Sequence, residues 1–295
     1  MRIAVIGKSG QLARCLAETA PTEMEVAYFG RAEMDIAQPE TNFAALTAYR
    51  PDLLINASAY TAVDKAESDR EAAFALNEHG PARLAKFASE LGIPLIHVST
   101  DYVFDGAASR PYTEDDPTAP LNVYGESKLA GEQAVVRICP RHIIIRTSWL
   151  YSAYGHNFVK TMLRLGSEKD VLRIVADQRG RPTSTHELAR VIWIIVQAIH
   201  DAPHSVPWGL YHYADAGEAS WADFAEAIFA ASKPQLPNVP KIERITTAEF
   251  PTPAPRPLHS VLDSTKIERA FNIQAQPWTE SLKEILARIH EEATV

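Results

Sequence analysis

Short apolar runs alternate with amphipathic stretches through the first half of the chain. The apolar runs cover residues 2–6, 25–29, 53–57, 95–99 and 142–147, and the amphipathic stretches between them include residues 12–20, 42–49, 71–91 and 123–136. Strands that are buried on both faces need continuous Val, Ile and Leu, and parallel strands need long crossovers between them. The pattern therefore predicts an α/β fold, with a Rossmann-type doubly wound parallel sheet covered by helices on both faces.

The pattern changes after residue 148. We expect strands over residues 171–176 and 209–214, helices over 185–200, 220–231 and 280–291, and a proline-rich passage over 233–257 that excludes long regular elements. This organisation predicts a nucleotide-binding Rossmann domain over residues 1–147, to which segments at roughly 171–200 return. Most of residues 148–295 would then form a smaller mixed α/β substrate-binding domain.

Charge and cysteine content exclude several classes of protein. The formal charge of the 295 residues is −8, which argues against nucleic-acid or membrane partners, because both need clustered Lys and Arg. Only Cys15 and Cys139 occur, outside any disulfide or zinc pattern, and the ten histidines have no metal-ligand spacing, so we assign no metal. We expect a soluble protein of the reducing cytoplasm, because no apolar run has the length of a signal sequence or membrane span.

A glycine motif follows the first apolar run and leads into the first helix. Gly7, Gly10 and Ala13 have a Gly-x-x-Gly-x-x-Ala spacing, which lets a diphosphate approach backbone N–H groups and the helix dipole. An ordinary strand-to-helix turn would have the same spacing, but the position directly after an N-terminal strand favours a dinucleotide site. The predicted cradle consists of Gly7, Lys8, Ser9, Gly10, Gln11 and Leu12.

The second strand ends near Arg31, which can pair with the 2′-phosphate of NADP, whereas an acidic residue there would favour NAD. The alternative is that Arg31 is a solvated surface charge without a ligand. NADPH is therefore the favoured cofactor, and NADH stays possible. Other predicted cofactor contacts are Asp35 and Ile36 at the adenine, Ala57, Ser58, Ala59 and Tyr60 after the strand that we count as the fourth, and Asn77 on a flanking helix. The alternative for residues 57–60 is tight packing of the sheet, and the alternative for Asn77 is a polar residue on the protein surface.

Three side chains form a candidate reductase centre. Thr100 ends the strand that we count as the fifth, and Tyr124 and Lys128 are four residues apart, which places them on one helix face with Cβ atoms about 6 Å apart. We expect the ammonium group to lower the pKa of the phenol. Tyr124 would then protonate a carbonyl oxygen that Thr100 holds, while Lys128 stabilises the phenolate and contacts the cofactor. A surface helix would show the same Tyr-Lys spacing by chance.

Longer strings resemble those of the dTDP-4-dehydrorhamnose reductase family, in the extended branch of the short-chain dehydrogenase/reductase superfamily. They lie in the same order from end to end and cover residues 7–12, 56–67, 99–104, 120–125, 146–149, 157–162, 177–178, 182–183 and 256–257. The resemblance implies that NADPH reduces the 4-keto group of dTDP-4-dehydro-6-deoxy-L-mannose to give dTDP-L-rhamnose. It also implies that Tyr124 and Lys128 are the proton donor and its helper, assisted by Thr100, and that Thr100, Asp101 and Trp149 contact the sugar.

The substrate diphosphate needs cationic partners. Arg256 in the proline-rich passage is the first candidate, with Arg181 and Lys160 behind it, and each of the three is alternatively a solvated charge. Asn157 is a candidate for hydrogen bonds to the base or the sugar, as is Gln178.

Two positions bear on related activities. Dehydratases of the same superfamily carry Glu directly after a Thr-Asp pair, where this chain has Tyr102, so simple reduction is favoured over dehydration. Some family members dimerise through Mg²⁺ held by glutamates, and the aligned positions here are Cys15 and His186, neither of which is a hard oxygen ligand. We therefore doubt a magnesium bridge and expect a monomer or weak homodimer.

Two alternatives to the reductase stay open. One is a non-catalytic, NADP-binding regulatory subunit of the methionine adenosyltransferase type, which keeps the same fold. The other is a reductase or epimerase of a different nucleotide sugar.

Overall fold

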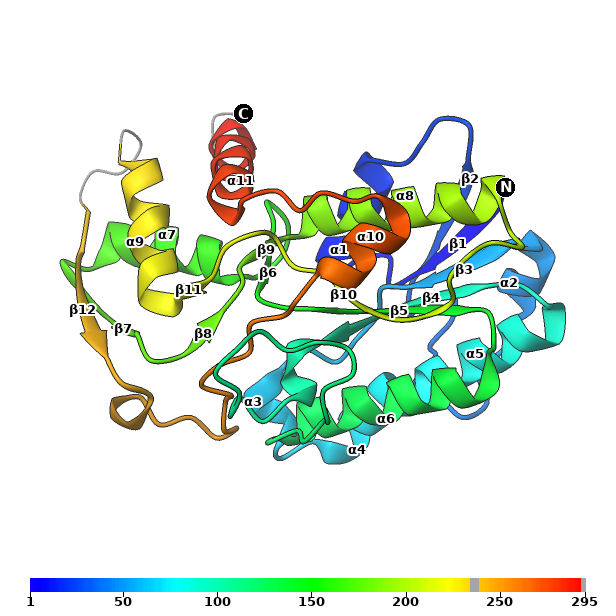
Figure 1. Cartoon of the computed structure of the whole chain (residues 1–295), viewed down its shortest axis with the longest axis horizontal. Helices are drawn as coiled ribbons and strands as arrows, with labels where there is room; N and C mark the ends of the chain where they lie inside the picture. The colour runs from blue at the N-terminus through cyan, green and yellow to red at the C-terminus, as the bar shows by residue number, and fades with distance from the viewer. Residues whose placement is uncertain (234–238, 293–295) are drawn as a thin grey trace.

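The computed structural model describes residues 1–233 and 239–292. Its main sheet has six strands in the order β10-β5-β4-β3-β1-β2, and every neighbouring pair is parallel (Figure 1). The strands are β1 (Arg2–Ile6), β2 (Glu25–Phe29), β3 (Leu53–Asn56), β4 (Leu95–Thr100), β5 (His142–Thr147) and β10 (Gly209–His212). This is the doubly wound parallel sheet that the apolar runs predict.

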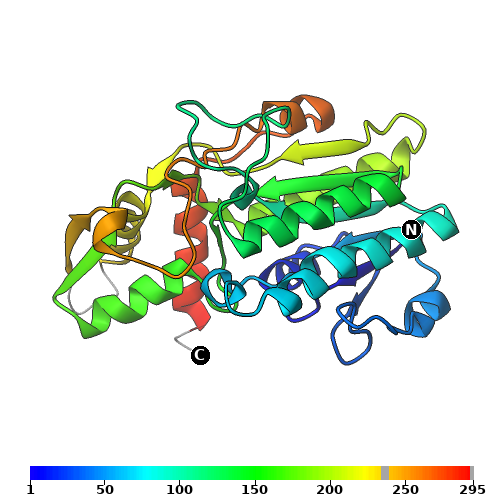
Figure 2. The ribbon, with the colours of Figure 1, turned by 90° about the horizontal axis from the view of Figure 1, so that it is seen from below.

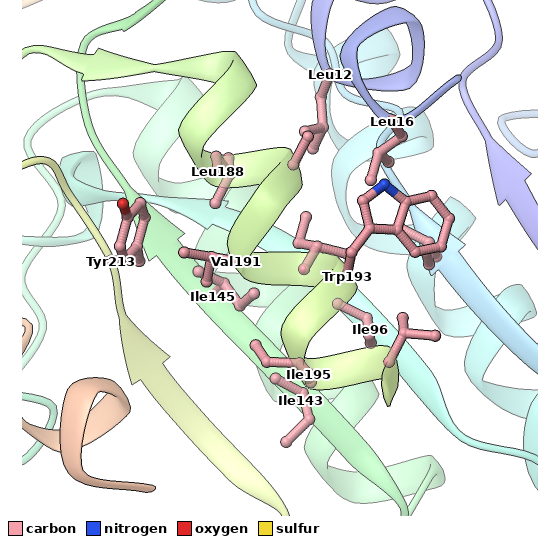
Figure 3. Packing of buried hydrophobic residues seen from close by; sticks show 14 of the residues in the cluster. Leu12, Leu16, Ile96, Ile143, Ile145, Leu188, Val191, Trp193, Ile195 and Tyr213 are labelled. Carbon is pink, nitrogen blue, oxygen red and sulfur yellow. The ribbon is translucent and has the colours of Figure 1, made fainter. Parts of the chain in front are cut away.

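Helices cover both faces of the sheet (Figures 1 and 2). One face carries α1 (Gln11–Glu18), α8 (Thr185–Asp201) and α10 (Thr265–Phe271), and the other carries α2 (Ala44–Tyr49), α5 (Gly80–Leu91) and α6 (Val123–Ile138). Figure 3 shows how side chains of α1 and α8 meet those of β4 and β5 in the first of these layers. Trp193 lies in this layer and its Nε1 donates to Thr19 Oγ1 at 3.1 Å.

The chain reverses direction across the sheet at β1. From β1 it runs outward to β2, and β3 then pairs with the other side of β1. The crevice beyond the carboxyl ends of β1 and β3 is therefore the topological switch point, where open α/β sheets bind their ligands. Short helices α3 (Val63–Ala66) and α4 (Arg70–Phe74) and a π-helical turn (Ala75–His79) connect β3 to α5 beside it.

A second unit packs beyond the carboxyl edge of the sheet, on the left in Figure 1. Its apolar cluster joins α7 (Phe158–Glu168), α9 (Trp221–Ser232) and α11 (Trp278–Glu292) to the parallel pair of β7 (Val171–Val175) and β12 (Lys241–Ile245). Shorter elements lie between the units: β6 (Leu150–Tyr151) pairs with β9 (Thr183–Ser184), β8 (Arg179–Gly180) pairs with β11 (Ala219–Ser220), and two 3₁₀ turns span Asp101–Val103 and Thr247–Glu249.

Some element predictions need correction. The strands ending at residues 56 and 100 are the third and fourth along the chain, not the fourth and fifth. The predicted strand at 171–176 corresponds to β7, which pairs with β12 outside the main sheet. The later strand that joins the main sheet is β10, which pairs with β5. β12 falls inside the proline-rich passage, in a stretch without proline; residues 234–238 of that passage lie outside the described residues.

The predicted amphipathic stretch 71–91 is interrupted by the π-helical turn. The carbonyl of Asn77 in that turn lies against α6, where a Cβ on Gly131 would come within 2.0 Å of it. Close contact of the two backbones at this glycine therefore accommodates the wider turn. Across residues 1–233 and 239–292, no helix is both long and apolar enough to cross a membrane.

Candidate active site

A cleft of about 1070 Å³ opens at the switch point and extends toward the second unit. Its wall contains most of the residues predicted from sequence: Gly7, Ser9, Gly10, Gln11, Leu12, Arg31, Asp35, Ile36, Ala57, Ser58, Ala59, Tyr60, Thr100, Asp101, Tyr124, Lys128 and Trp149. Seven predicted contacts do not line it, namely Lys8, Asn77, Asn157, Lys160, Gln178, Arg181 and Arg256. The cleft thus joins the glycine motif to the Thr-Tyr-Lys centre.

The turn after β1 has the geometry of a phosphate cradle. Gly7 has φ +109°, and a Cβ there would lie 2.8 Å from the Ser58 amide nitrogen, so only glycine fits. Gly10 begins α1, and no side chain caps that end of the helix. The N–H groups of the first turn therefore remain available for an anion, and the loop fits a dinucleotide diphosphate.

The tip of β2 carries charges of both signs. Arg31 is 82% exposed in its side chain and its Nε lies 2.8 Å from Asp35 Oδ2. Burial would raise the pKa of Asp35, but hydrogen bonds from Arg31 and the Ala37 amide hold it below its usual value. Glu33, which we did not predict, accepts from Lys8 Nζ at 3.0 Å and from the Gly30 amide at 3.0 Å. The Lys8 side chain is therefore paired with the Glu33 carboxylate and does not line the cleft.

Asn77 supports the cofactor side of the cleft from behind. It is only 1% exposed, its Oδ1 accepts from the Tyr60 amide at 2.8 Å, and its Nδ2 donates to the Tyr60 carbonyl at 3.1 Å. Nδ2 also donates to Ser127 Oγ on α6 at 3.0 Å. The side chain thus fixes the loop after β3 to the helix that carries the Tyr-Lys pair, rather than facing the cleft.

Thr100, Tyr124 and Lys128 come together as predicted, but the expected pKa effect is wrong. Burial raises the pKa of Tyr124 to about 12, a hydrogen bond from Thr100 opposes the shift, and Asp101 adds to it. The Lys128 ammonium instead donates to the Val98 carbonyl at 2.7 Å. The phenol therefore stays protonated at neutral pH, as a proton donor requires.

Lys128 is 2% exposed. Burial lowers its pKa to about 8, and the negative charge of Glu132 one turn further along α6 opposes the shift. Glu132 is itself held by Arg146 of β5, with 2.7 Å between Oε2 and Nη2. This buried pair keeps a carboxylate behind the lysine, which favours the ammonium form.

The carboxyl ends of β4 and β5 present several polar atoms that lack a partner within the described residues. Asp101 is 1% exposed, and burial raises its pKa to about 6, against hydrogen bonds from Ser260, Thr100 and the backbone. Asp101 Oδ2, Ser99 Oγ and Thr147 Oγ1 make no hydrogen bond within the described part of the chain. All three residues line the cleft, where a ligand can satisfy them.

Trp149 lies where a sugar-binding residue is expected, but its ring is not open. Its φ of 48° is in the left-handed region, and Gly180 packs so closely that a Cβ there would come within 2.5 Å of the indole. Trp221, which sequence reasoning missed, stacks on Trp149 with ring centroids 3.6 Å apart and an interplanar angle of 7°. Both indoles line the cleft.

The predicted diphosphate ligands already have partners. Arg256 forms a fork with Asp64 at 2.8 and 3.0 Å, and Arg181 donates to the carbonyls of Asp215 and Leu262, each at 2.7 Å. Lys160 Nζ donates to the Ala153 carbonyl at 2.9 Å.

The two predicted amide ligands are also engaged. Asn157 caps α7 by accepting from the Lys160 amide, and its Nδ2 donates to Gln11 Oε1 at 3.1 Å. Gln178 bonds Trp221 and Thr247. Whether any of these groups meets the substrate stays a prediction.

The two positions aligned with metal ligands of relatives lie apart from the cleft. Cys15 is buried in the layer between α1 and α8, and burial raises its pKa to about 12. His186 Nε2 lies 3.1 Å from Arg288 Nη2. No group of three or more His, Cys, Asp or Glu is arranged to hold a metal within residues 1–233 and 239–292.

Comparison with known proteins decides the family. The model of the family described as RmlD substrate binding domain matches residues 1–291. A dTDP-4-dehydrorhamnose reductase of Sinorhizobium fredii is 45% identical over 97% of both chains. The chain belongs to the dTDP-4-dehydrorhamnose reductase family.

Other members of the dTDP-4-dehydrorhamnose reductase family agree in sequence and in structure. The Escherichia coli K12 reductase is 40% identical over 97% of each chain. Crystal structures of the reductases of Clostridium acetobutylicum and Bacillus anthracis superpose with TM-scores of 0.90, at 37% and 35% identity; they cover 98% and 97% of this chain, and it covers 100% and 99% of theirs. The Bacillus anthracis protein is in complex with NADP.

Proposed function

We propose that this protein uses NADPH to reduce the C4 ketone of dTDP-4-dehydro-6-deoxy-L-mannose, giving dTDP-L-rhamnose. The observation that carries the proposal is that Thr100, Tyr124 and Lys128 line the same cleft as the glycine cradle of β1. Membership of the reductase family supports the choice of substrate. The cofactor would lie against the domain of residues 1–147, and the sugar nucleotide would lie between it and residues 148–295.

Bound NADPH supplies the hydride that reduces the carbonyl carbon. The chain's own residues orient the substrate and move the proton. Thr100 Oγ1 lies beside the Tyr124 phenol and holds the carbonyl oxygen, which takes the proton of Tyr124 as negative charge develops on it. The buried ammonium of Lys128, which lies on the same helix face, then stabilises the phenolate with its positive charge.

Arg31 supports NADPH over NADH, because it lines the cleft at the tip of β2 with an exposed guanidinium group. A bound 2′-phosphate would compete with Asp35 for it. Arg256 is paired with the Asp64 carboxylate, so it could bind the substrate diphosphate only after this ion pair breaks. We further infer a cytoplasmic protein that acts on a small molecule as a monomer or weak homodimer, without nucleic-acid or membrane partners.

The proposal is tested by incubating the purified protein with NADPH and dTDP-4-dehydro-6-deoxy-L-mannose. We expect stoichiometric loss of absorbance at the nicotinamide band and formation of dTDP-L-rhamnose. The UDP-linked and GDP-linked 4-ketosugars serve as matched controls for a reductase of another nucleotide sugar. Absence of oxidation with the dTDP-sugar, under conditions where NADPH binds, would refute the proposal.

The non-catalytic regulatory subunit is the less favoured alternative, because relatives that are 40%, 43% and 45% identical are named as reductases. It predicts that NADPH binds without turnover of any dTDP-sugar and that a partner enzyme co-purifies. The reductase proposal predicts turnover by the isolated chain.

A further inference from the structure

The Trp149–Trp221 stack raises a question about how the sugar reaches its site. The two indoles are nearly parallel with ring centroids 3.6 Å apart, so no other ring can enter between them while Trp221 covers this face of Trp149. Gly180 packs against the Trp149 ring without room for a methyl group. Trp149, the indole predicted to stack on the sugar, therefore already has Trp221 and Gly180 packed against its ring.

The backbone at Trp149 favours a functional role for this ring. A non-glycine residue with φ 48° carries a strain of about 1–3 kcal/mol, which persists only where surrounding structure imposes it. Trp149 lies two residues after the end of β5, and it lines the cleft together with Thr147, whose hydroxyl has no partner within the described residues. The strained turn thus places a large aromatic ring on the wall of the cleft.

A chain of hydrogen bonds holds Trp221 in place. Its Nε1 donates to Gln178 Oε1 at 3.1 Å, and Gln178 Nε2 donates to Thr247 Oγ1 at 3.1 Å. Thr247 in turn donates to the Asp177 carboxylate at 2.7 Å. Phe158 adds an edge contact, with ring centroids 4.7 Å apart. These contacts come from segments outside the main sheet, whereas the reacting groups come from β4 and α6.

We propose that Trp221 gates the sugar site: it stacks on Trp149 and withdraws when the sugar of the nucleotide sugar enters, so that the deoxysugar takes its place on the Trp149 ring. This inference rests on the proposed function, because it needs a sugar nucleotide as ligand. A pyranose with a C6 methyl group has the apolar face that stacks on an indole, so it can replace the contact that Trp221 gives up.

The spectroscopic test uses protein labelled with 5-fluorotryptophan. The chain has five tryptophans, and Trp→Phe variants at positions 149 and 221 assign the two ¹⁹F resonances of the stack. We expect both resonances to shift when dTDP-L-rhamnose is added, and to stay in place with dTDP alone or NADP⁺ alone. Unchanged resonances under saturating dTDP-L-rhamnose would overturn the proposal.

The binding test separates a withdrawing residue from a fixed wall. Removing the stack and its hydrogen bond by Trp221→Ala should tighten binding of dTDP-L-rhamnose about tenfold, since opening no longer breaks these contacts. Gln178→Ala keeps the stack and should tighten binding about threefold, without changing the Kd of NADPH. Gln178→Ala also keeps the proposal testable if the Trp221→Ala variant fails to fold. Gln197→Ala also removes a glutamine side-chain hydrogen bond, the exposed one to Asp201 on α8 away from the cleft; it is the control and should change neither Kd.

The outcomes distinguish the two proposals. If the wild-type chain neither binds dTDP-L-rhamnose nor oxidises NADPH with the ketosugar, the proposed function and this inference both fail. If the wild type turns over but Trp221→Ala and Gln178→Ala weaken binding of dTDP-L-rhamnose, only the inference fails, because Trp221 is then a fixed part of the sugar site.

Discussion

Asp101→Asn should stabilise the unliganded protein at the cost of its activity. Asp101 is 1% exposed, and burial raises the pKa of its carboxyl from 3.8 to about 6. Asparagine keeps an oxygen that can accept from Thr100 Oγ1, which lies 3.1 Å from Asp101 Oδ1, and removes only the ionisation. The substitution therefore isolates the free-energy cost of a buried carboxylate.

The sign and size follow from proton linkage. The folded protein binds the Asp101 proton more tightly than the unfolded chain does, so the free energy of unfolding falls as pH rises from about 4 to about 6. Two pKa units correspond to about 3 kcal/mol at pH 8, and roughly half of that is already lost at pH 5. Asp101→Asn should therefore raise the free energy of unfolding by up to about 3 kcal/mol at pH 8, and by about half as much at pH 5.

Urea unfolding at pH 5 and pH 8, followed by circular dichroism, measures both values. Asp105→Asn is the matched control with the opposite sign, because hydrogen bonds from the Ala107 amide and Tyr112 lower the pKa of that carboxyl. Asp105→Asn should be less stable than the wild type by about the same amount at pH 5 and pH 8, because the lowered pKa of Asp105 leaves this carboxyl ionised at both pH values. An Asp101→Asn variant that is less stable than the wild type at pH 8, or equally stabilised at both pH values, would refute the argument from burial.

Three further substitutions test the cofactor and substrate sides of the cleft. Gly7→Ala places a Cβ 2.8 Å from the Ser58 amide nitrogen at a residue with φ +109°. It should lower the free energy of unfolding in urea by about 2 kcal/mol or more and weaken NADPH binding in a fluorescence titration. Gly92→Ala, at φ +65° with open space around the Cβ, is the control for backbone strain alone. Arg31→Ala should raise the KM for NADPH about tenfold or more and leave that for NADH unchanged, because NADH lacks the 2′-phosphate; equal effects on both would contradict the assignment. Asp64→Asn frees Arg256 from its fork and should lower the KM for the dTDP-sugar, whereas a higher KM would show that the fork itself shapes the site.

Much of the main sheet could be predicted because its signals are local. The apolar runs of β1, β2 and β5 match the observed strands residue for residue, and the glycine motif lies where the fold needs it. Parallel strands with their carboxyl ends at one edge then bring Thr100 near Tyr124 without further information.

The parts that sequence could not predict depend on contacts between distant segments. The π-helical turn at Asn77 exists because Gly131, 54 residues later, lets α6 approach, and β12 pairs with β7 although 65 residues separate their ends. The raised pKa of Tyr124 has the same origin, since burial outweighs the ammonium charge that the local spacing suggests.

Trp221 shows the same limit at the site. The Ser220–Asp223 capping box marks the start of a helix in the sequence, and an indole directly after the cap is visible there. Nothing local indicates that this indole meets Trp149, which lies 72 positions earlier in the chain.

Transfer of deuterium tests the central claim most directly. NADPH that carries deuterium at both C4 positions of the nicotinamide is incubated with dTDP-4-dehydro-6-deoxy-L-mannose and the protein, and the product is analysed by mass spectrometry and NMR. The account predicts dTDP-L-rhamnose with one deuterium at sugar C4 for the wild type, and no product for Tyr124→Phe although that variant still binds NADPH. Unlabelled product, or near-wild-type turnover by Tyr124→Phe, would contradict it.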